Sequence, residues 1–119
     1  MSNDSLKLSG AMVEISTEPT QVIERVVYKY KLENRTAIRF STRIPMWSDM
    51  LHVGMQDGEF FLWALVETGN VPTREVVFHI FGTGMVFKND DSLVHKATIF
   101  DGPFVWHVFQ NLTKSEPNS

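Results

Sequence analysis

The sequence predicts an all-β domain, an antiparallel sandwich or flattened barrel of about seven strands. Three observations support this fold class. Short runs alternate apolar with polar residues, which is the period of a strand with one wet face. Aromatic residues make up 12% of the chain and fall mostly inside these runs, as expected for strands. Turn-forming Asp-Gly, Gly and Pro residues separate the runs, and no segment has helical periodicity.

The chain of 119 residues predicts one domain, large enough to bury roughly 65% of its unfolded surface around a single core. Residues 1–20 contain no aromatic residue and are expected to form a flexible N-terminal arm. Residues 21–111 form the single β domain, and residues 112–119 are predicted to be a disordered tail.

The central element is a hairpin over Met50–Val66, with Asp57-Gly58 as a two-residue turn. This turn places Met55, Val53 and Leu51 opposite Phe60, Leu62 and Ala64 on one apolar face. Gly54, His52 and Met50 then lie opposite Phe61, Trp63 and Leu65 on the other face. Both faces are largely apolar, so we expect a second layer on one face and further protein or a partner subunit on the other.

The elements before this hairpin are a strand over 22–32 and a strand over 36–41, predicted to pair as an outer hairpin. A loop over 43–49 follows, because Pro45 cannot donate to a ladder. Trp47 in this loop is expected to close the end of the core, with an exposed contact as the alternative.

After the hairpin, residues 67–73 form a loop and residues 74–81 a strand that is apolar on both sides. Gly82-Thr83-Gly84 predicts a bulge, a tight corner or a ligand-facing turn. Residues 87–92 are expected to be a polar surface loop. The last two strands cover 93–100 and 104–110, joined by Asp101-Gly102-Pro103.

Composition restricts the classes of function. The chain has no cysteine, which excludes a disulfide scaffold, a cysteine-ligated zinc site and a cysteine nucleophile. A net charge of −3 argues against a general nucleic-acid binder. No apolar run approaches the roughly 18 residues that predict a membrane span, and the polar start is not a signal peptide. We expect a soluble, intracellular protein.

No pattern of residues predicts catalysis. His52, His79, His95 and His107 fall in predicted strands, but none forms a ligand-spaced pair, so we expect satisfied, half-buried imidazoles. The chain has no nucleophile elbow, and its carboxylates fall in turns. We expect a protein that is not an enzyme and that holds no cofactor and no metal.

Residues 25–110 resemble a family of short proteins encoded by bacteriophages and prophages. The resemblance rests on four stretches: Tyr28-Lys29-Tyr30, Leu62-Trp63-Ala64-Leu65-Val66, Gly82-Thr83-Gly84 and Phe104-Val105-Trp106-His107-Val108-Phe109. This chain departs from the family in its long N-terminal arm and in Met85, where the family often has His. The resemblance implies a non-virion accessory protein acting in the cytoplasm of the infected bacterium.

The surplus of aromatic residues predicts an interface, with a homo-oligomer as the commonest solution. Our first hypothesis is a protein-binding module with an acidic, aromatic-rich surface that inhibits or redirects a host protein, such as a defence component. The second is an oligomer that sequesters a nucleotide-like signal, with a tryptophan stacking on the base and arginines holding phosphate. The third is a minor structural role in the virion. The candidate binding surface comprises Arg35, Arg39, Arg43, Trp47, His52, Trp63, Gly82, Thr83, Gly84, Trp106 and His107.

Overall fold

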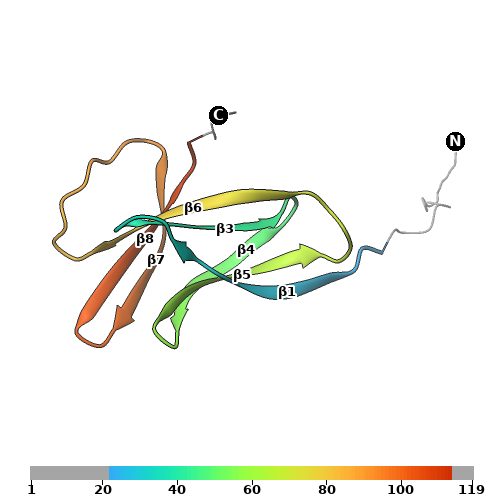
Figure 1. Ribbon diagram of the computed structural model, residues 1–119, viewed down its shortest axis with the longest axis horizontal. Coiled ribbons are helices and arrows are strands. Elements are labelled where there is room, and N and C mark those ends of the chain that lie inside the picture. The colour runs from blue at the N-terminus through green and yellow to red at the C-terminus, as the bar shows by residue number, and fades with distance from the viewer. Residues whose placement is uncertain (1–21, 114–119) are drawn as a thin grey trace, which may run out of the picture.

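The computed structural model describes residues 22–113 (Figure 1). The arm predicted for residues 1–20 and all but the first two residues of the predicted tail lie outside this range. Residues 22–113 contain strands and turns but no helix. No membrane-spanning helix is therefore found in the part of the chain that the structure describes.

Eight strands form two antiparallel sheets, and the prediction of an all-β sandwich is confirmed. Sheet A has three strands in the order β1-β5-β4, and sheet B has five in the order β2-β3-β6-β8-β7. The architecture is an open sandwich and not a closed barrel. The strands are β1 (Arg25–Lys31), β2 (Glu33–Asn34), β3 (Arg39–Pro45), β4 (Asp49–Gln56), β5 (Glu59–Glu67), β6 (Thr73–Gly82), β7 (Leu93–Asp101) and β8 (Phe104–Asn111).

The β4–β5 hairpin has the predicted turn. Asp57 and Gly58 have φ angles of 53° and 79°, the left-handed values that a type I′ turn requires. The register is as expected from Gln56 opposite Glu59 back to His52 opposite Trp63. It then shifts, because a bulge at Leu51 places Met50 opposite Ala64. The predicted pairing of Leu51 with Ala64, and of Met50 with Leu65, is therefore wrong.

The predicted hairpin of residues 22–32 with 36–41 is also wrong. Strand β1 pairs with β5 in sheet A, with Tyr28 opposite Ala64, whereas β3 pairs with β6 in sheet B. The chain changes sheets at Leu32, which is only 2% exposed and donates its amide to the Phe60 carbonyl at 2.9 Å. Burying Leu32 between the layers prevents the two strands from remaining in one sheet.

The core lies between the sheets and draws on both. It is a cluster of eight buried residues: Leu32, Ile44, Val53, Leu62, Val76, Phe78, Ile80 and Val108. The largest buried side chain is that of Phe78 in β6, which is fully buried. Partly buried residues around this cluster include Phe60 and Trp106, whose rings meet edge to face with centroids 6.1 Å apart.

Two aromatic residues in loops differ from expectation. Trp47 is 61% exposed and does not close the end of the core. Phe87, placed by the sequence in a polar surface loop, stacks on Phe81 with ring centroids 3.8 Å apart. The Phe87 ring covers the Phe81 side chain, which points to the outer side of sheet B. This contact explains why Phe81 is buried although it lies on that side.

Truncation of the buried Phe78 side chain should destabilise the fold far more than truncation of the exposed Phe100 side chain. We expect Phe78→Ala to lower the free energy of unfolding by about 3–5 kcal/mol, the usual cost of a cavity left by phenylalanine. Phe100→Ala, at a side chain that is 78% exposed, should change it by less than about 1 kcal/mol. Urea denaturation followed by circular dichroism measures both, and equal losses would contradict this core.

Candidate functional site

The outer face of sheet A is an apolar surface with aromatic rings at its centre. Phe61 and Trp63 project outward from the middle strand β5, with ring centroids 6.0 Å apart. His52 of β4 lies in register with Trp63, and their rings are 5.6 Å apart. Val27 and Leu51 add side chains that are 50% and 53% exposed. We refer to this surface, made by Val27, Lys29, Leu51, His52, Phe61, Trp63 and Leu65, as the aromatic face.

Gly54 makes the aromatic face flat. A Cβ atom at position 54 would lie 2.7 Å from Nε2 of His52, a distance that real Cβ atoms do not reach. The imidazole therefore occupies the space that a side chain at position 54 would need. On the other side of β5, Lys29 extends over the Phe61 ring at 4.7 Å and donates to Gln56 at 2.6 Å. Both long side chains lie along the sheet and do not project from it.

Ion pairs border this face at its two ends. Arg25 of β1 lies 3.6 Å from Asp49 of β4, and Lys31 of β1 lies 3.7 Å from Glu59 of β5. Exposed pairs of this kind contribute about 0–1 kcal/mol to stability. Their position is more informative, because an apolar centre surrounded by charged residues is the usual composition of a protein–protein interface.

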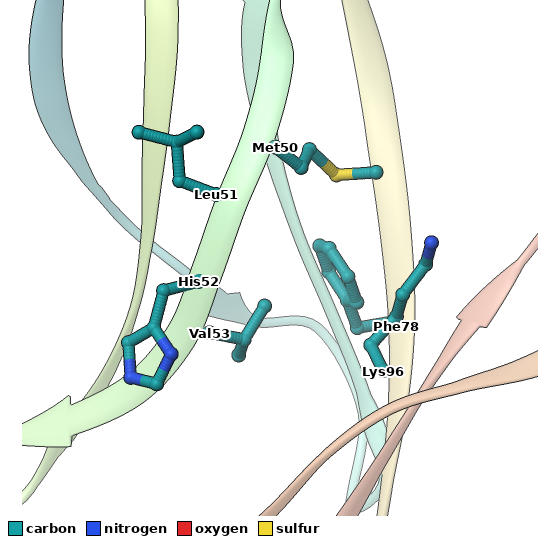
Figure 2. A pocket seen from close by; sticks show the side chains of 6 residues that line it. All are labelled: Met50, Leu51, His52, Val53, Phe78 and Lys96. Atoms are coloured by element: carbon teal, nitrogen blue, oxygen red, sulfur yellow. The ribbon is translucent and has the colours of Figure 1, made fainter.

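A pocket opens between the edge strands β4 and β7 (Figure 2). Met50 and Val53 point from β4 toward Phe78 and Lys96, whereas Leu51 and His52 point to the opposite side of β4. This reversal follows from the bulge at Leu51, which places Leu51 and His52 on the same outward face. Lys96 of β7 also lies at a register shift. The pocket is lined mainly by apolar side chains and offers few groups for chemistry.

Three of the four histidines gather on the outer face of sheet B. His79, Phe109 and His95 lie side by side on β6, β8 and β7, and His107 lies on β8 next to Thr98. We call His79, His95 and His107 the histidine row. The Thr98 hydroxyl is 2.9 Å from Nε2 of His95 and 3.3 Å from Nδ1 of His107.

A chain of hydrogen bonds joins two members of the histidine row, His95 and His107. Nε2 of His107 lies 2.8 Å from the Thr83 hydroxyl, so four side chains, His95, Thr98, His107 and Thr83, form one continuous chain. The tautomer of each imidazole decides which atom donates in each of these hydrogen bonds. Of the four histidines expected to be satisfied and half-buried, His107 is half-buried and hydrogen-bonded, whereas His52 and His95 are exposed. Among residues 22–113, no group of three or more His, Asp or Glu side chains is arranged to hold a metal ion.

His79 has an altered affinity for protons. Burial lowers its pKa, and the nearby Arg39 guanidinium lowers the pKa further, whereas the Asp90 carboxylate raises it. Asp90 belongs to the loop that carries Phe87, and hydrogen bonds from Ser92 lower the pKa of Asp90 itself. The loop thus contributes both a ring and a charge to the outer side of sheet B.

The β7–β8 hairpin ends in exposed aromatic residues. Phe100 is 78% exposed and Phe104 is 56% exposed. Phe104 stacks on Trp106 with centroids 5.8 Å apart, and the Trp106 indole donates to the Asp101 carboxylate at 3.3 Å. We call Phe100, Phe104 and the intervening turn the hairpin tip.

The candidate residues from the sequence do not form one site. His52 and Trp63 lie on the aromatic face, Thr83 and His107 in the chain of hydrogen bonds, and Trp106 faces the other sheet. Gly82 is the last residue of β6, and Gly84 has a φ angle of 94° in the turn that follows, which agrees with the predicted corner.

The three candidate arginines are spread along β3 and the segment before it. Arg35 donates to Ser41 at 2.8 Å, and Arg43 donates to the Thr73 hydroxyl at 3.0 Å. Arg39 lies in register with His79 on the outer side of sheet B. The aromatic face, with Trp63, lies on the opposite side of the sandwich. The arginines and Trp63 are therefore not brought together within one protomer.

Sequence reasoning missed two parts of these surfaces. Leu51 was assigned to the same face of the hairpin as Val53 and Met55, and only the bulge turns it to the other face. Phe100 was treated as an ordinary strand residue, although its place next to Asp101-Gly102-Pro103 indicated that it lies at the end of a hairpin.

A model for a domain of unknown function, DUF7352, matches residues 23–119. The chain belongs to this family. The matched range includes all eight strands, and therefore the aromatic face, the histidine row and the hairpin tip. The search of curated proteins and the search of solved structures found no match to this DUF7352 chain.

The pKa of His79 should respond in opposite directions to its two charged neighbours. We expect its NMR titration midpoint to lie below the ordinary value of about 6.5. Arg39→Gln should raise the midpoint, and Asp90→Asn should lower it, because each removes one of the two charges. Asp91→Asn serves as the matched control and should have a smaller effect.

Because the pKa of His79 is lowered in the folded chain, the free energy of unfolding should depend on pH. As the pH falls through about 6.5, the unfolded chain takes up a proton before the folded chain does, so the free energy of unfolding should decrease. A His79 midpoint above 6.5, or an Asp90→Asn variant with a raised midpoint, would contradict this environment.

Proposed function

We propose that this protein is a protein-binding module that contacts its target with the hairpin tip. In line with the resemblance to phage-encoded proteins, the target is a host protein inside the infected bacterium, and a component of a defence system is the first candidate. The module acts by occupying a surface of that protein, and it needs no catalytic group of its own.

The observation that carries this proposal is the exposure of aromatic rings on both faces of one hairpin. Phe100 shares a face of the hairpin with Val105, and Phe104 shares the other face with Asp101. Sheet A lies on only one side of this hairpin, so it cannot cover both rings. A partner that receives the tip in a groove covers both at once.

Phe104, one of the two rings of the hairpin tip, is held in place before binding. Phe104 is stacked on Trp106, and the Trp106 ring is in turn in contact with Phe60 of the other sheet. The Asp101 hydrogen bond to the Trp106 indole connects the two strands next to the turn. Such preorganisation reduces the conformational entropy lost on binding, which favours a tight complex.

The alternative of a nucleotide-like ligand has less support from this geometry. Stacking and phosphate binding need a tryptophan and an arginine that converge on one ligand. Arg39 and Trp63 lie on opposite sides of the sandwich, so a site of this kind would have to be completed by another subunit. The minor virion role remains a prediction from the sequence.

Photo-cross-linking in bacterial cells tests the proposal directly. Benzoylphenylalanine at position 100 replaces one aromatic ring with another and should yield an adduct with one heterologous protein, identified by mass spectrometry. The same group at position 47, whose tryptophan is 61% exposed in a different loop, is the control. Adducts with a heterologous protein from position 47 and none from position 100 would contradict a target site at the hairpin tip.

Removal of the exposed rings should weaken the complex with the protein so identified. We expect Phe100→Ala and Phe104→Ala each to cost about 2 kcal/mol of binding free energy, or roughly a 30-fold increase in Kd, as for central interface residues. Isothermal titration calorimetry with the purified partner measures the change. Trp47→Ala, at an exposed ring outside both the hairpin tip and the aromatic face, is the control and should leave Kd within about threefold.

A further inference from the structure

We propose that the aromatic face is a homodimer interface in which a second copy of the chain stacks its own sheet A against the first. The inference does not rest on the proposed target binding, because the hairpin tip lies on the other sheet. The occupant is a second copy for three reasons: the flatness of the face, its arrangement of charge, and the bulge at one edge of each sheet.

A flat, apolar sheet face with aromatic rings at its centre is suited to packing against another sheet. Two sheets pack with their strands within about 30° of each other and about 10 Å apart. The His52 imidazole lies in the space above Gly54, and Lys29 lies along Phe61, so no long side chain projects from the face to obstruct a second sheet.

Charge determines the orientation of the two copies. On this face, β1 presents Arg25, Lys29 and Lys31, the middle strand β5 presents Glu59 and Glu67, and β4 presents Asp49. A two-fold axis along β5 places β1 of one copy over β4 of the other. Arg25 of one copy then lies over Asp49 of the second copy at one end of the interface, so opposite charges meet there.

The other in-plane two-fold axis, perpendicular to β5, places β1 over β1 of the second copy. Arg25, Lys29 and Lys31 would then face the same basic residues of the partner, and like charges across an interface are unfavourable. The arrangement along β5 is therefore the one that this face supports.

Pairing at the β4 edge of sheet A or the β7 edge of sheet B is less favourable than pairing through this face. The edge strands β4 and β7 both carry a register shift, next to Leu51 and Lys96. Bulges at edge strands oppose the addition of a further strand. Association through the β4 and β7 edges is disfavoured, whereas no part of residues 22–113 covers the aromatic face.

This arrangement has a consequence for target binding. The turns of the β4–β5 and β7–β8 hairpins lie at the same end of the molecule (Figure 1). A two-fold axis along β5 keeps that end the same in both copies, so the dimer presents two hairpin tips toward one side. Two tips on one side permit bivalent attachment to a target that offers two sites.

Sedimentation equilibrium of the full chain tests the dimer. Three strands at a spacing of about 4.8 Å make a narrow face, so we expect dissociation in the micromolar range. The mass should approach about 27 kDa, twice the 13.6 kDa of one chain, as the concentration rises. Trp63→Lys should raise the dissociation constant at least 100-fold and leave a monomer. Phe100→Ala should remain a dimer.

Two further results would overturn the inference. A wild-type chain that stays monomeric at several hundred micromolar would do so, as would a Trp63→Lys variant that is folded by circular dichroism and still dimeric. Leu65→Lys provides a second substitution on the same face if Trp63→Lys fails to fold, and its persistence as a dimer would count equally against the proposal.

Cross-linking distinguishes the two orientations, because the natural chain has no cysteine. A short bismaleimide should join Val27→Cys protein to Leu51→Cys protein when the two are mixed, since β1 of one copy lies over β4 of the other. Efficient cross-linking of Val27→Cys protein to itself, with none in the mixture, would overturn the orientation along β5.

Discussion

The burial of Leu32 between the two sheets is the constraint on which the rest of this structure depends. Its amide bonds the carbonyl of Phe60 in sheet A, and its side chain packs in the core shared with sheet B. The chain leaves sheet A at this residue and enters sheet B at Glu33. Strand β1 is thereby committed to β5, and β3 is free to pair with β6.

This change of sheet determines which surfaces are left for partners. Among residues 22–113, sheet A receives three strands, and no loop of this range lies on its outer side as the loop with Phe87 lies against Phe81 on sheet B. Trp63 and its neighbours on the aromatic face are consequently open on that side within the described residues. The β7–β8 hairpin, at the edge of sheet B, extends its exposed phenylalanines away from the core.

Local signals in the sequence predicted the fold class, the β4–β5 turn and most strand positions, because alternation and Asp57-Gly58 act over a few residues. These local signals did not predict the features that depend on packing between residues far apart in the sequence. Nothing between residues 32 and 36 signals a change of sheet, so a hairpin was expected. The bulge that turns Leu51 outward depends on twist and packing across strands. The histidine row could not be predicted from the sequence either, because only the register of three strands brings its members together.

The pairing of β1 tests this account most directly. In an NMR spectrum of the full chain, cross-strand NOEs between backbone protons of Tyr28 and Ala64, which are in register, should be present. Their presence would establish the three-stranded sheet whose outer side is the aromatic face. NOEs from Tyr28 to residues 36–41 in their place would mean that β1 and β3 form a hairpin, and would contradict the change of sheet at Leu32.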